Sequence, residues 1–150
     1  MKLSIIIPVY NERSTVTELI AKVEAAPVPC EKELIIVDDG STDGTRELLH
    51  PYESRHRVIY HPRNRGKGAA LRSGLGQVTG DVVLFQDADL EYEPTEYPQL
   101  LAPILDGKAD VVYGCRFLGG PHRVLFFWHY VGNKLLTLIT DALYDINLSD

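Results

Sequence analysis

Two aspartates that lie one residue apart, Asp87 and Asp89, closely follow a short apolar segment over residues 82–85. The segment is typical of a buried strand, and a third carboxylate, Glu91, comes two residues later. Alternate side chains of an extended chain point to the same side, so the two aspartates would repel each other without a cation between them. Divalent cations prefer oxygen ligands and often bind substrate phosphates, so the pattern predicts a metal site for a diphosphate. A solvated acidic turn is the alternative, because an isolated Asp-x-Asp is common.

Basic residues and glycines elsewhere in the chain would suit the same ligand. Arg65, Lys67 and Arg116 are candidate cations for a diphosphate, and Gly66 and Gly68 would let the backbone approach it closely. The Gly-Lys-Gly sequence suits an exposed loop before a helix equally well. The chain contains neither a P-loop sequence nor a Gly-x-Gly-x-x-Gly after its first predicted strand, which disfavours those two kinds of phosphate site.

A second acidic pair, Asp38 and Asp39, follows another predicted strand. One of the two is expected to face the edge of the sheet, where hydrogen bonding to a nucleoside base or ribose is a better use than a second metal site. An Asx turn with a helix cap is the alternative, which the nearby Ser41 and Asp43 support. Each aspartate could serve one of these purposes.

The elements that must position these residues alternate between strands and helices. Strands are predicted over residues 3–9, 33–37, 57–60, 81–85 and 109–114, with helices around residues 16–23, 69–76 and 94–105. This alternation predicts an α/β fold with a mostly parallel sheet flanked by helices, in which ligands bind beyond the carboxyl ends of the strands. Residues 10–12, 38–39, 87–89 and 115–116 all follow predicted strands, so they should converge at one edge.

Composition limits the remaining possibilities. The chain has 150 residues, which suits one domain with a sizeable core, and its net charge of −6 disfavours a nucleic-acid partner. The two cysteines, Cys30 and Cys115, lack metal-ligand spacing, which favours a reducing compartment. Strand-like sequence begins at Leu3, so no signal peptide is expected, and no apolar stretch is long enough to span a bilayer. Three histidines are expected on solvated loops, namely His50, His56 and His61.

Residues 124–139 are helical in character and unusually aromatic. Residues 132–134 (Gly-Asn-Lys) interrupt the apolar pattern, which argues against a spanning helix. The segment could lie in a membrane interface, with Trp128 and Tyr130 at the level of the headgroups. Packing on the domain core or on a further part of the protein is the alternative, and the sequence favours it slightly.

Four segments in this order resemble the motifs of the family-2 glycosyltransferases of GT-A fold, and above all the branch of dolichol-phosphate mannose synthases and polyprenyl-phosphate glycosyltransferases. These segments are residues 7–12, 37–45, 64–70 and 87–90. The resemblance covers nearly the whole chain and is more specific for the superfamily than for the sugar. It implies a donor-binding α/β core over residues 1–118 and an acceptor-side helical segment over residues 119–150. Family members continue further, so the resemblance also implies a truncated chain.

The resemblance implies a role for individual residues in binding a nucleotide sugar. The nucleotide pocket would be lined by Pro8, Tyr10 and Glu12, and the base and ribose would be contacted by Val37 and Asp39. The phosphates would lie near Arg116. Further donor-binding candidates are Asn11, Lys67, Gln86 and Ala88. Asp87 and Asp89 would hold Mg2+ or Mn2+ against the diphosphate. Glu91 stands where many relatives have glutamine and could be a further ligand. Family members are inverting enzymes that need a carboxylate near the acceptor, and Asp150 is the candidate here.

The implied activity is the metal-dependent transfer of a sugar from GDP-mannose or a UDP-sugar to a polyprenyl phosphate. The expected location is cytoplasmic, at the inner face of the membrane, with peripheral membrane association and a second copy of the chain as possible partners. A sugar-nucleotidyltransferase is one alternative, but such enzymes usually open with a Gly-rich, Arg-containing loop, which residues 8–12 are not. A non-catalytic nucleotide-sugar-binding module is the other: the intact acidic pair argues against it, and the missing carboxyl-terminal part argues for it.

Overall fold

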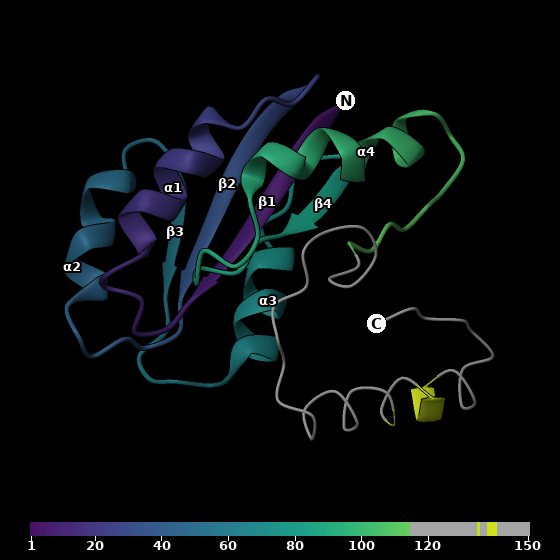
Figure 1. Cartoon of the computed structure of the whole chain (residues 1–150). Helices are drawn as coiled ribbons and strands as arrows, with labels where there is room; N and C mark the ends of the chain where they lie inside the picture. Colours follow the sequence, from purple (N-terminus) through teal and green to yellow (C-terminus); the bar gives the residue numbers. More distant parts are fainter. Residues whose placement is uncertain (115–134, 136–137, 141–150) are drawn as a thin grey trace. The chain divides into compact units, whose positions relative to one another are not determined.

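A computed structural model describes residues 1–114, 135 and 138–140 of the chain (Figure 1). Four strands form one parallel sheet in the order β3-β2-β1-β4, so the strand order reverses between β1 and β4. The elements are β1 (Lys2–Val9), α1 (Val16–Ala25), β2 (Glu31–Asp38), α2 (Thr45–Leu49), η1 (His50–Tyr52), β3 (Arg57–Tyr60), α3 (Lys67–Leu75), β4 (Val82–Phe85), η2 (Pro94–Glu96) and α4 (Tyr97–Leu105), where η marks a short 3-10 helix. The predicted parallel sheet with flanking helices is therefore confirmed.

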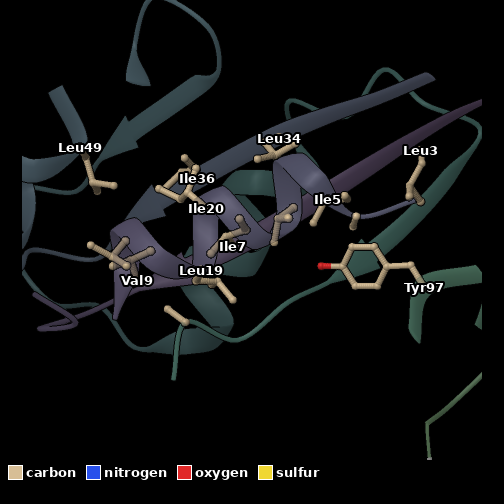
Figure 2. Packing of buried hydrophobic residues seen from close by; sticks show 14 of the residues in the cluster. Leu3, Ile5, Ile7, Val9, Leu19, Ile20, Leu34, Ile36, Leu49 and Tyr97 are labelled. Atoms are coloured by element: carbon tan, nitrogen blue, oxygen red, sulfur yellow. The ribbon is translucent and has the colours of Figure 1, made fainter. Parts of the chain in front are cut away.

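The central strands are buried on both faces, which explains their nearly continuous apolar sequences. Side chains alternate along β1, so Ile5 and Ile7 belong to the core on one face of the sheet, while Ile6 belongs to the core on the other. Figure 2 shows Leu19 and Ile20 of α1 lying over the first of these faces. Burying each such side chain contributes roughly 1.5–3 kcal/mol relative to leaving it exposed.

Helices cover the two faces of the sheet unequally. On the face shown in Figure 2, α1 is joined by Leu49 of α2 and by Tyr97 and Leu101 of α4. On the other face α3 packs closely, because Gly74 has no side chain: a Cβ at this position would lie 2.6 Å from Cγ2 of Ile6. A larger residue at Gly74 would push α3 away from the sheet.

One predicted strand, over residues 109–114, is wrong. These residues adopt no regular secondary structure, and Val111 and Tyr113 are 64% and 80% exposed. An apolar alternation forms a strand only where a neighbouring strand supplies hydrogen bonds and another layer covers the side chains. Within the described part of the chain, β4 pairs with β1 and with no further strand, so residues 109–114 find neither.

The remaining predicted elements are present with shifted ends. β1 begins one residue earlier than predicted, at Lys2. Helix α1 extends to Ala25, two residues beyond its predicted end, and the Thr15 hydroxyl before it donates to Oε2 of Glu12 at 2.7 Å. Sequence patterns predict the position of an element more accurately than they predict its first and last residues, because the ends depend on local loop geometry.

Residues Met1–Ala102 form one compact unit, and the rest of the chain, Pro103–Asp150, is assigned to a second. The predicted division after residue 118 falls outside the described residues and stays a prediction. The aromatic segment over residues 124–139 lies largely outside them as well. Among the described residues, no helix combines the length and the apolar character needed to cross a membrane.

At the amino-terminal edge of the sheet, Glu33 ties three segments together. Its carboxylate accepts hydrogen bonds from the Ser4 hydroxyl at 2.6 Å and from the Thr79 backbone at 2.8 Å, and it pairs with Lys2 at 2.7 Å. Partial burial opposes the ionisation of Glu33, but the bonds from Lys2, Ser4 and Thr79 outweigh it and lower the pKa from 4.5 to about 2. The ionised carboxylate therefore stabilises the fold.

We expect Glu33→Gln to lower the free energy of unfolding by about 1–3 kcal/mol at pH 7, as for the loss of hydrogen bonds to a charged group. Because the folded-state pKa lies below the unfolded value, this stabilisation is complete above pH 4.5 and declines as the pH falls toward 2. The difference between wild type and variant should therefore shrink between pH 5 and pH 3 in urea titrations. Glu31→Gln, at an exposed position of the same strand, is the control. A difference that stays constant with pH would contradict this account.

Candidate functional site

The carboxyl ends of β1 and β4 border a hollow of about 260 Å³. This is the place where the strand order reverses, and parallel sheets commonly bind ligands at such points. The lining residues come from the end of β1 and the loop after it, from the loop after β2, from the loop after β3 with the first turn of α3, and from the turn after β4: Pro8, Val9, Tyr10 and Glu12; Asp39; Asn64, Lys67 and Ala70; and Asp87, Ala88 and Asp89. The predicted convergence of polar residues at this edge is therefore observed for the loops after β1, β2 and β4.

The acidic pair lies in the turn that follows β4, and both carboxylates line the hollow. The residue between them, Ala88, is buried at 5% exposure, which leaves Asp87 and Asp89 at the surface of the hollow. Oδ1 of Asp89 accepts a hydrogen bond from the backbone N–H of Glu91 at 3.0 Å, and Leu90 has a φ of 62°. The turn is therefore shaped by the second aspartate itself.

Gln86 lies behind this turn and does not line the hollow. It is 2% exposed, and its Oε1 accepts a hydrogen bond from the Tyr97 hydroxyl at 2.7 Å. Its amide donates to the carbonyl oxygens of Asp87 at 3.0 Å and Tyr92 at 3.3 Å. Burial raises the pKa of Tyr97, so this hydroxyl remains a donor. The side chain of Gln86 thus holds the acidic turn, and it is not placed to contact a ligand in the hollow.

The ammonium group of Lys67 forms an ion pair with the carboxylate of Asp87. Nζ of Lys67 lies 2.7 Å from Oδ1 and 2.8 Å from Oδ2 of this carboxylate. Lys67 is 61% exposed, and an ion pair so accessible to water contributes at most about 1 kcal/mol. A divalent ion could therefore replace Lys67 beside Asp87, and a diphosphate could replace Asp87 as the partner of Lys67.

The donor set fits a divalent cation in part. Asp87 and Asp89 present carboxylate oxygens to the same hollow, and oxygen ligands suit Mg2+ and Mn2+. Glu91 is not among the lining residues, and the described residues contain no group of three or more His, Cys, Asp or Glu side chains arranged to hold a metal. Two protein ligands and the oxygens of a diphosphate would complete such a site, which is how Mg2+ is commonly bound.

Asp39 is buried at 3% exposure, although it borders the hollow. Its Oδ1 lies 2.6 Å from Nδ1 of His61 and accepts from the Arg65 backbone N–H at 3.0 Å. Its Oδ2 accepts from the Gly66 N–H at 2.7 Å. Gly66 has a φ of 88°, and its carbonyl accepts the first bonds of α3 from Ala69 and Ala70 at 2.9 and 3.2 Å. Asp39 therefore holds the loop that carries Lys67.

The neighbouring Asp38 serves the turn, as one of the two predicted alternatives requires. It is fully buried, its Oδ1 accepts from the backbone N–H of Ser41 at 3.1 Å, and its Oδ2 pairs with Nη2 of Arg46 at 2.6 Å. Asp43 accepts from the Thr45 backbone at 3.0 Å, at the start of α2. Only the second aspartate of the pair reaches the hollow.

Two predicted donor-binding residues support the hollow without lining it. Asn11, with a φ of 55°, donates its backbone N–H to Oγ of Ser41 at 3.0 Å, and its Oδ1 accepts from the backbone of Thr42 at 2.9 Å. These bonds tie the loop after β1 to the loop after β2. Val37 is fully buried in the core. Arg116 and Asp150 lie outside the described residues, so their roles stay predictions.

His61 was expected on a solvated loop, and this expectation is wrong. The imidazole is 5% exposed and lies between Asp39 and Ser73, with Nε2 2.9 Å from the Ser73 hydroxyl. A signal was available in the sequence, because His61 directly follows β3 and therefore stands at the carboxyl edge of a parallel sheet, as do the acidic residues.

Residues 4–150 match the model of the family described as Glycosyl transferase family 2. The dolichol-phosphate mannosyltransferase of Pyrococcus furiosus is 35% identical over 122 residues, which make up 80% of this chain and 34% of that protein. The undecaprenyl-phosphate 4-deoxy-4-formamido-L-arabinose transferase of Pseudomonas savastanoi pv. phaseolicola is 41% identical over 156 residues, covering 98% of this chain and 44% of that protein. The chain thus spans less than half the length of these two relatives.

Solved structures agree with the family match. S. aureus TarS 1-349 in complex with UDP aligns with a TM-score of 0.63 at 30% identity, over 81% of this chain and 38% of that one. The mannosyltransferase PcManGT from Pyrobaculum calidifontis, in complex with GDP-Man and Mn2+, aligns with a TM-score of 0.53 at 30% identity, over 58% of this chain and 27% of that one. The predicted GT-A fold is therefore confirmed. Because the family model covers nearly the whole length, the chain belongs to glycosyl transferase family 2.

Proposed function

We propose that this chain forms the donor side of an inverting glycosyltransferase, which moves a sugar from a nucleotide diphosphate sugar to a polyprenyl phosphate. The observation that carries the proposal is the hollow at the carboxyl ends of β1 and β4, which Asp39, Asp87 and Asp89 all line. Family membership supports the reaction type, and the two relatives named for dolichol phosphate and undecaprenyl phosphate support the lipid acceptor. GDP-mannose and UDP-sugars are the candidate donors.

In this proposal each loop contacts a different part of the donor. Pro8, Tyr10 and Glu12 line the nucleotide, while Asp39 accepts a hydrogen bond from the base or ribose. Asp39 suits this task because it borders the hollow and is held in one orientation by its neighbours. Asn11 and Val37 act indirectly, by supporting the loop after β1 and the end of β2.

The diphosphate is proposed to lie against Asp87 and Asp89, with Mg2+ or Mn2+ between the carboxylates and the phosphates. The ion would supply Lewis-acid stabilisation of the charge on the leaving diphosphate. Nζ of Lys67 pairs with the Asp87 carboxylate at 2.7 Å. Because the pair is exposed and weak, Lys67 can turn to a phosphate oxygen when the donor binds. Arg116 is proposed as a second cation for the phosphates.

The acceptor side is proposed to draw on residues 119–150. Asp150 would be the carboxylate near the acceptor, and the apolar and aromatic residues of this segment would meet the lipid or a second copy of the chain. Three described residues of this segment support an apolar surface, since Leu135, Leu138 and Ile139 are 55%, 65% and 46% exposed. A polyprenyl phosphate acceptor places the reaction at a membrane, for which the cytoplasmic face is our proposal.

Calorimetry of UDP, GDP and their sugar derivatives with Mn2+, Mg2+ or a chelator tests the donor half of the proposal. We expect micromolar dissociation constants for one nucleotide with metal, an order of magnitude that corresponds to about −8 kcal/mol, and much weaker binding with chelator. A radiolabelled donor and a polyprenyl phosphate, with extraction of the lipid product, test the acceptor half.

Three outcomes would contradict the proposal in different ways. Equal affinity with metal and with chelator would remove the metal from it. Failure of both nucleotides to bind would remove the donor site. Release of pyrophosphate from a nucleoside triphosphate and a sugar phosphate would instead identify a sugar-nucleotidyltransferase.

A further inference from the structure

We propose that His61 is a positioning residue for the nucleoside of the donor, acting through Asp39. The inference rests on the proposed function and adds a residue that makes no direct contact with the hollow. His61 directly follows β3, is 5% exposed, and does not line the hollow, whereas Asp39 does.

The imidazole is held on both ring nitrogens. Nδ1 lies 2.6 Å from Oδ1 of Asp39, and Nε2 lies 2.9 Å from the hydroxyl of Ser73 in α3. The backbone of His61 is held as well, because its N–H donates to the carbonyl of Asp38 at 2.8 Å and its carbonyl accepts from Arg46 at 2.6 Å. A residue held by two contacts of its ring and two of its backbone can fix the carboxylate that its ring touches.

The chemistry of the partners determines the direction of these hydrogen bonds. An ionised carboxylate only accepts, so Nδ1 must carry the proton that is shared with Asp39. A serine hydroxyl can donate or accept, so Ser73 satisfies Nε2 in either of its states. The hydrogen bond from Nδ1 to Asp39 therefore has a fixed direction. The Ser73 hydroxyl can rotate to donate to Nε2 or to accept from it.

Asp39 needs this donation because its other donors come from a single loop. The backbone N–H of Arg65 is shared between Oδ1 at 3.0 Å and Oδ2 at 3.1 Å, and the N–H of Gly66 donates to Oδ2 at 2.7 Å. His61 is the side-chain donor from outside this loop, at 2.6 Å from Oδ1. It therefore helps to fix the rotation of the carboxylate, and with it the direction in which Asp39 meets a base N–H or ribose O–H at the hollow.

Two substitutions separate the contacts of the imidazole. Asparagine can place its amide N–H near the position of Nδ1, so His61→Asn retains the donation to Asp39 and loses the contact with Ser73. Glutamine can place its amide near the position of Nε2, so His61→Gln retains the contact with Ser73 and loses the donation. The two variants have similar polarity, which makes each the control of the other for general effects on folding.

We expect His61→Gln to weaken the binding of the preferred nucleoside diphosphate with Mn2+ by about 10-fold, as for the loss of one buried hydrogen bond. His61→Asn and Ser73→Ala should remain within about threefold of wild type. Inorganic pyrophosphate lacks the nucleoside, so its affinity should be nearly the same in all four proteins. The ratio of the two affinities, measured by calorimetry on the folded proteins, reports positioning of the nucleoside, and a loss of stability alone would not change it.

The outcomes distinguish this inference from the function on which it rests. If wild type binds a nucleoside diphosphate and the three variants bind it equally, or if His61→Asn is as weak as His61→Gln, the inference is overturned and the proposed function stands. If wild type binds pyrophosphate but prefers no nucleoside diphosphate over it, the nucleoside site itself is wrong, and the inference is overturned with it.

Discussion

Asp89→Asn is expected to abolish the difference between nucleotide binding with Mn2+ and nucleotide binding with a chelator. Asparagine keeps the oxygen that accepts the Glu91 backbone N–H at 3.0 Å, so the turn should retain its shape. It lacks the negative charge that makes a carboxylate the stronger ligand for a divalent ion. Replacing residues that merely support metal ligands costs about 10–100-fold, so the loss of a ligand should cost at least about 100-fold in affinity for the metal-nucleotide complex.

Glu91→Gln is the comparison for this experiment. The sequence pattern includes Glu91 among three acidic candidates, but only Asp87 and Asp89 line the hollow. We therefore expect Glu91→Gln to retain most of the metal-dependent affinity in calorimetry. Equal losses for both variants would return Glu91 to the ligand set. No loss for Asp89→Asn, with an unchanged thermal unfolding profile, would remove the acidic turn from the site.

Gly40→Ala is expected to lower the free energy of unfolding by about 2–5 kcal/mol, the sum of a left-handed backbone for alanine and a forced shift of neighbouring atoms. Gly40 has a φ of 77°, and a Cβ there would lie 2.4 Å from the carbonyl carbon of Arg63 and 2.5 Å from the nitrogen of Asn64. These are backbone atoms, so no side-chain rotation relieves the contact. Asn64 lines the hollow, and nucleotide binding should therefore weaken together with stability.

Gly68→Ala is the matched control for stability. A Cβ at this position meets no atom within 4 Å, and Gly68 lies within α3 with no positive φ. Alanine in a helix is favoured over glycine by about 0.5–1 kcal/mol, so this variant should be as stable as wild type or slightly more so. Urea unfolding of both variants measures the contrast. A Gly40→Ala protein as stable as wild type would show that the loop over residues 63–64 shifts without cost.

Hydrophobic patterns predict most of the fold because burial acts on every residue of an element. The apolar runs of β1 and β2 indicate strands that are buried on both faces. The helical spacing of apolar residues in α1 indicates one buried face, and its four side chains are fully buried: Val16, Leu19, Ile20 and Val23. The predicted strand over residues 109–114 fails for the complementary reason. A strand is stable only with a partner, and an apolar alternation carries no information about whether that partner is present.

The edge of the sheet that carries the candidate site can also be derived from the sequence. Parallel strands place all their carboxyl ends together, so the residue types after each strand were sufficient to bring Tyr10, Asp39, Asp87 and Asp89 to one hollow. The position of a residue relative to the carboxyl end of its strand depends on chain direction, and its role depends on side-chain chemistry. The amino-acid sequence contains both.

The tertiary structure specifies what each polar side chain does at that edge. It assigned Asp38 to the turn and Asp39 to the hollow, turned Gln86 toward Tyr97, and placed His61 between Asp39 and Ser73. The partners of Gln86 and His61 are 11 to 22 residues away in the sequence. The choice between Asp38 and Asp39 depends on the directions in which two neighbouring side chains point. A hydrogen bond requires its two atoms to lie within about 3 Å and in line, and that condition is met by the packing of whole elements, which no local pattern of residues specifies.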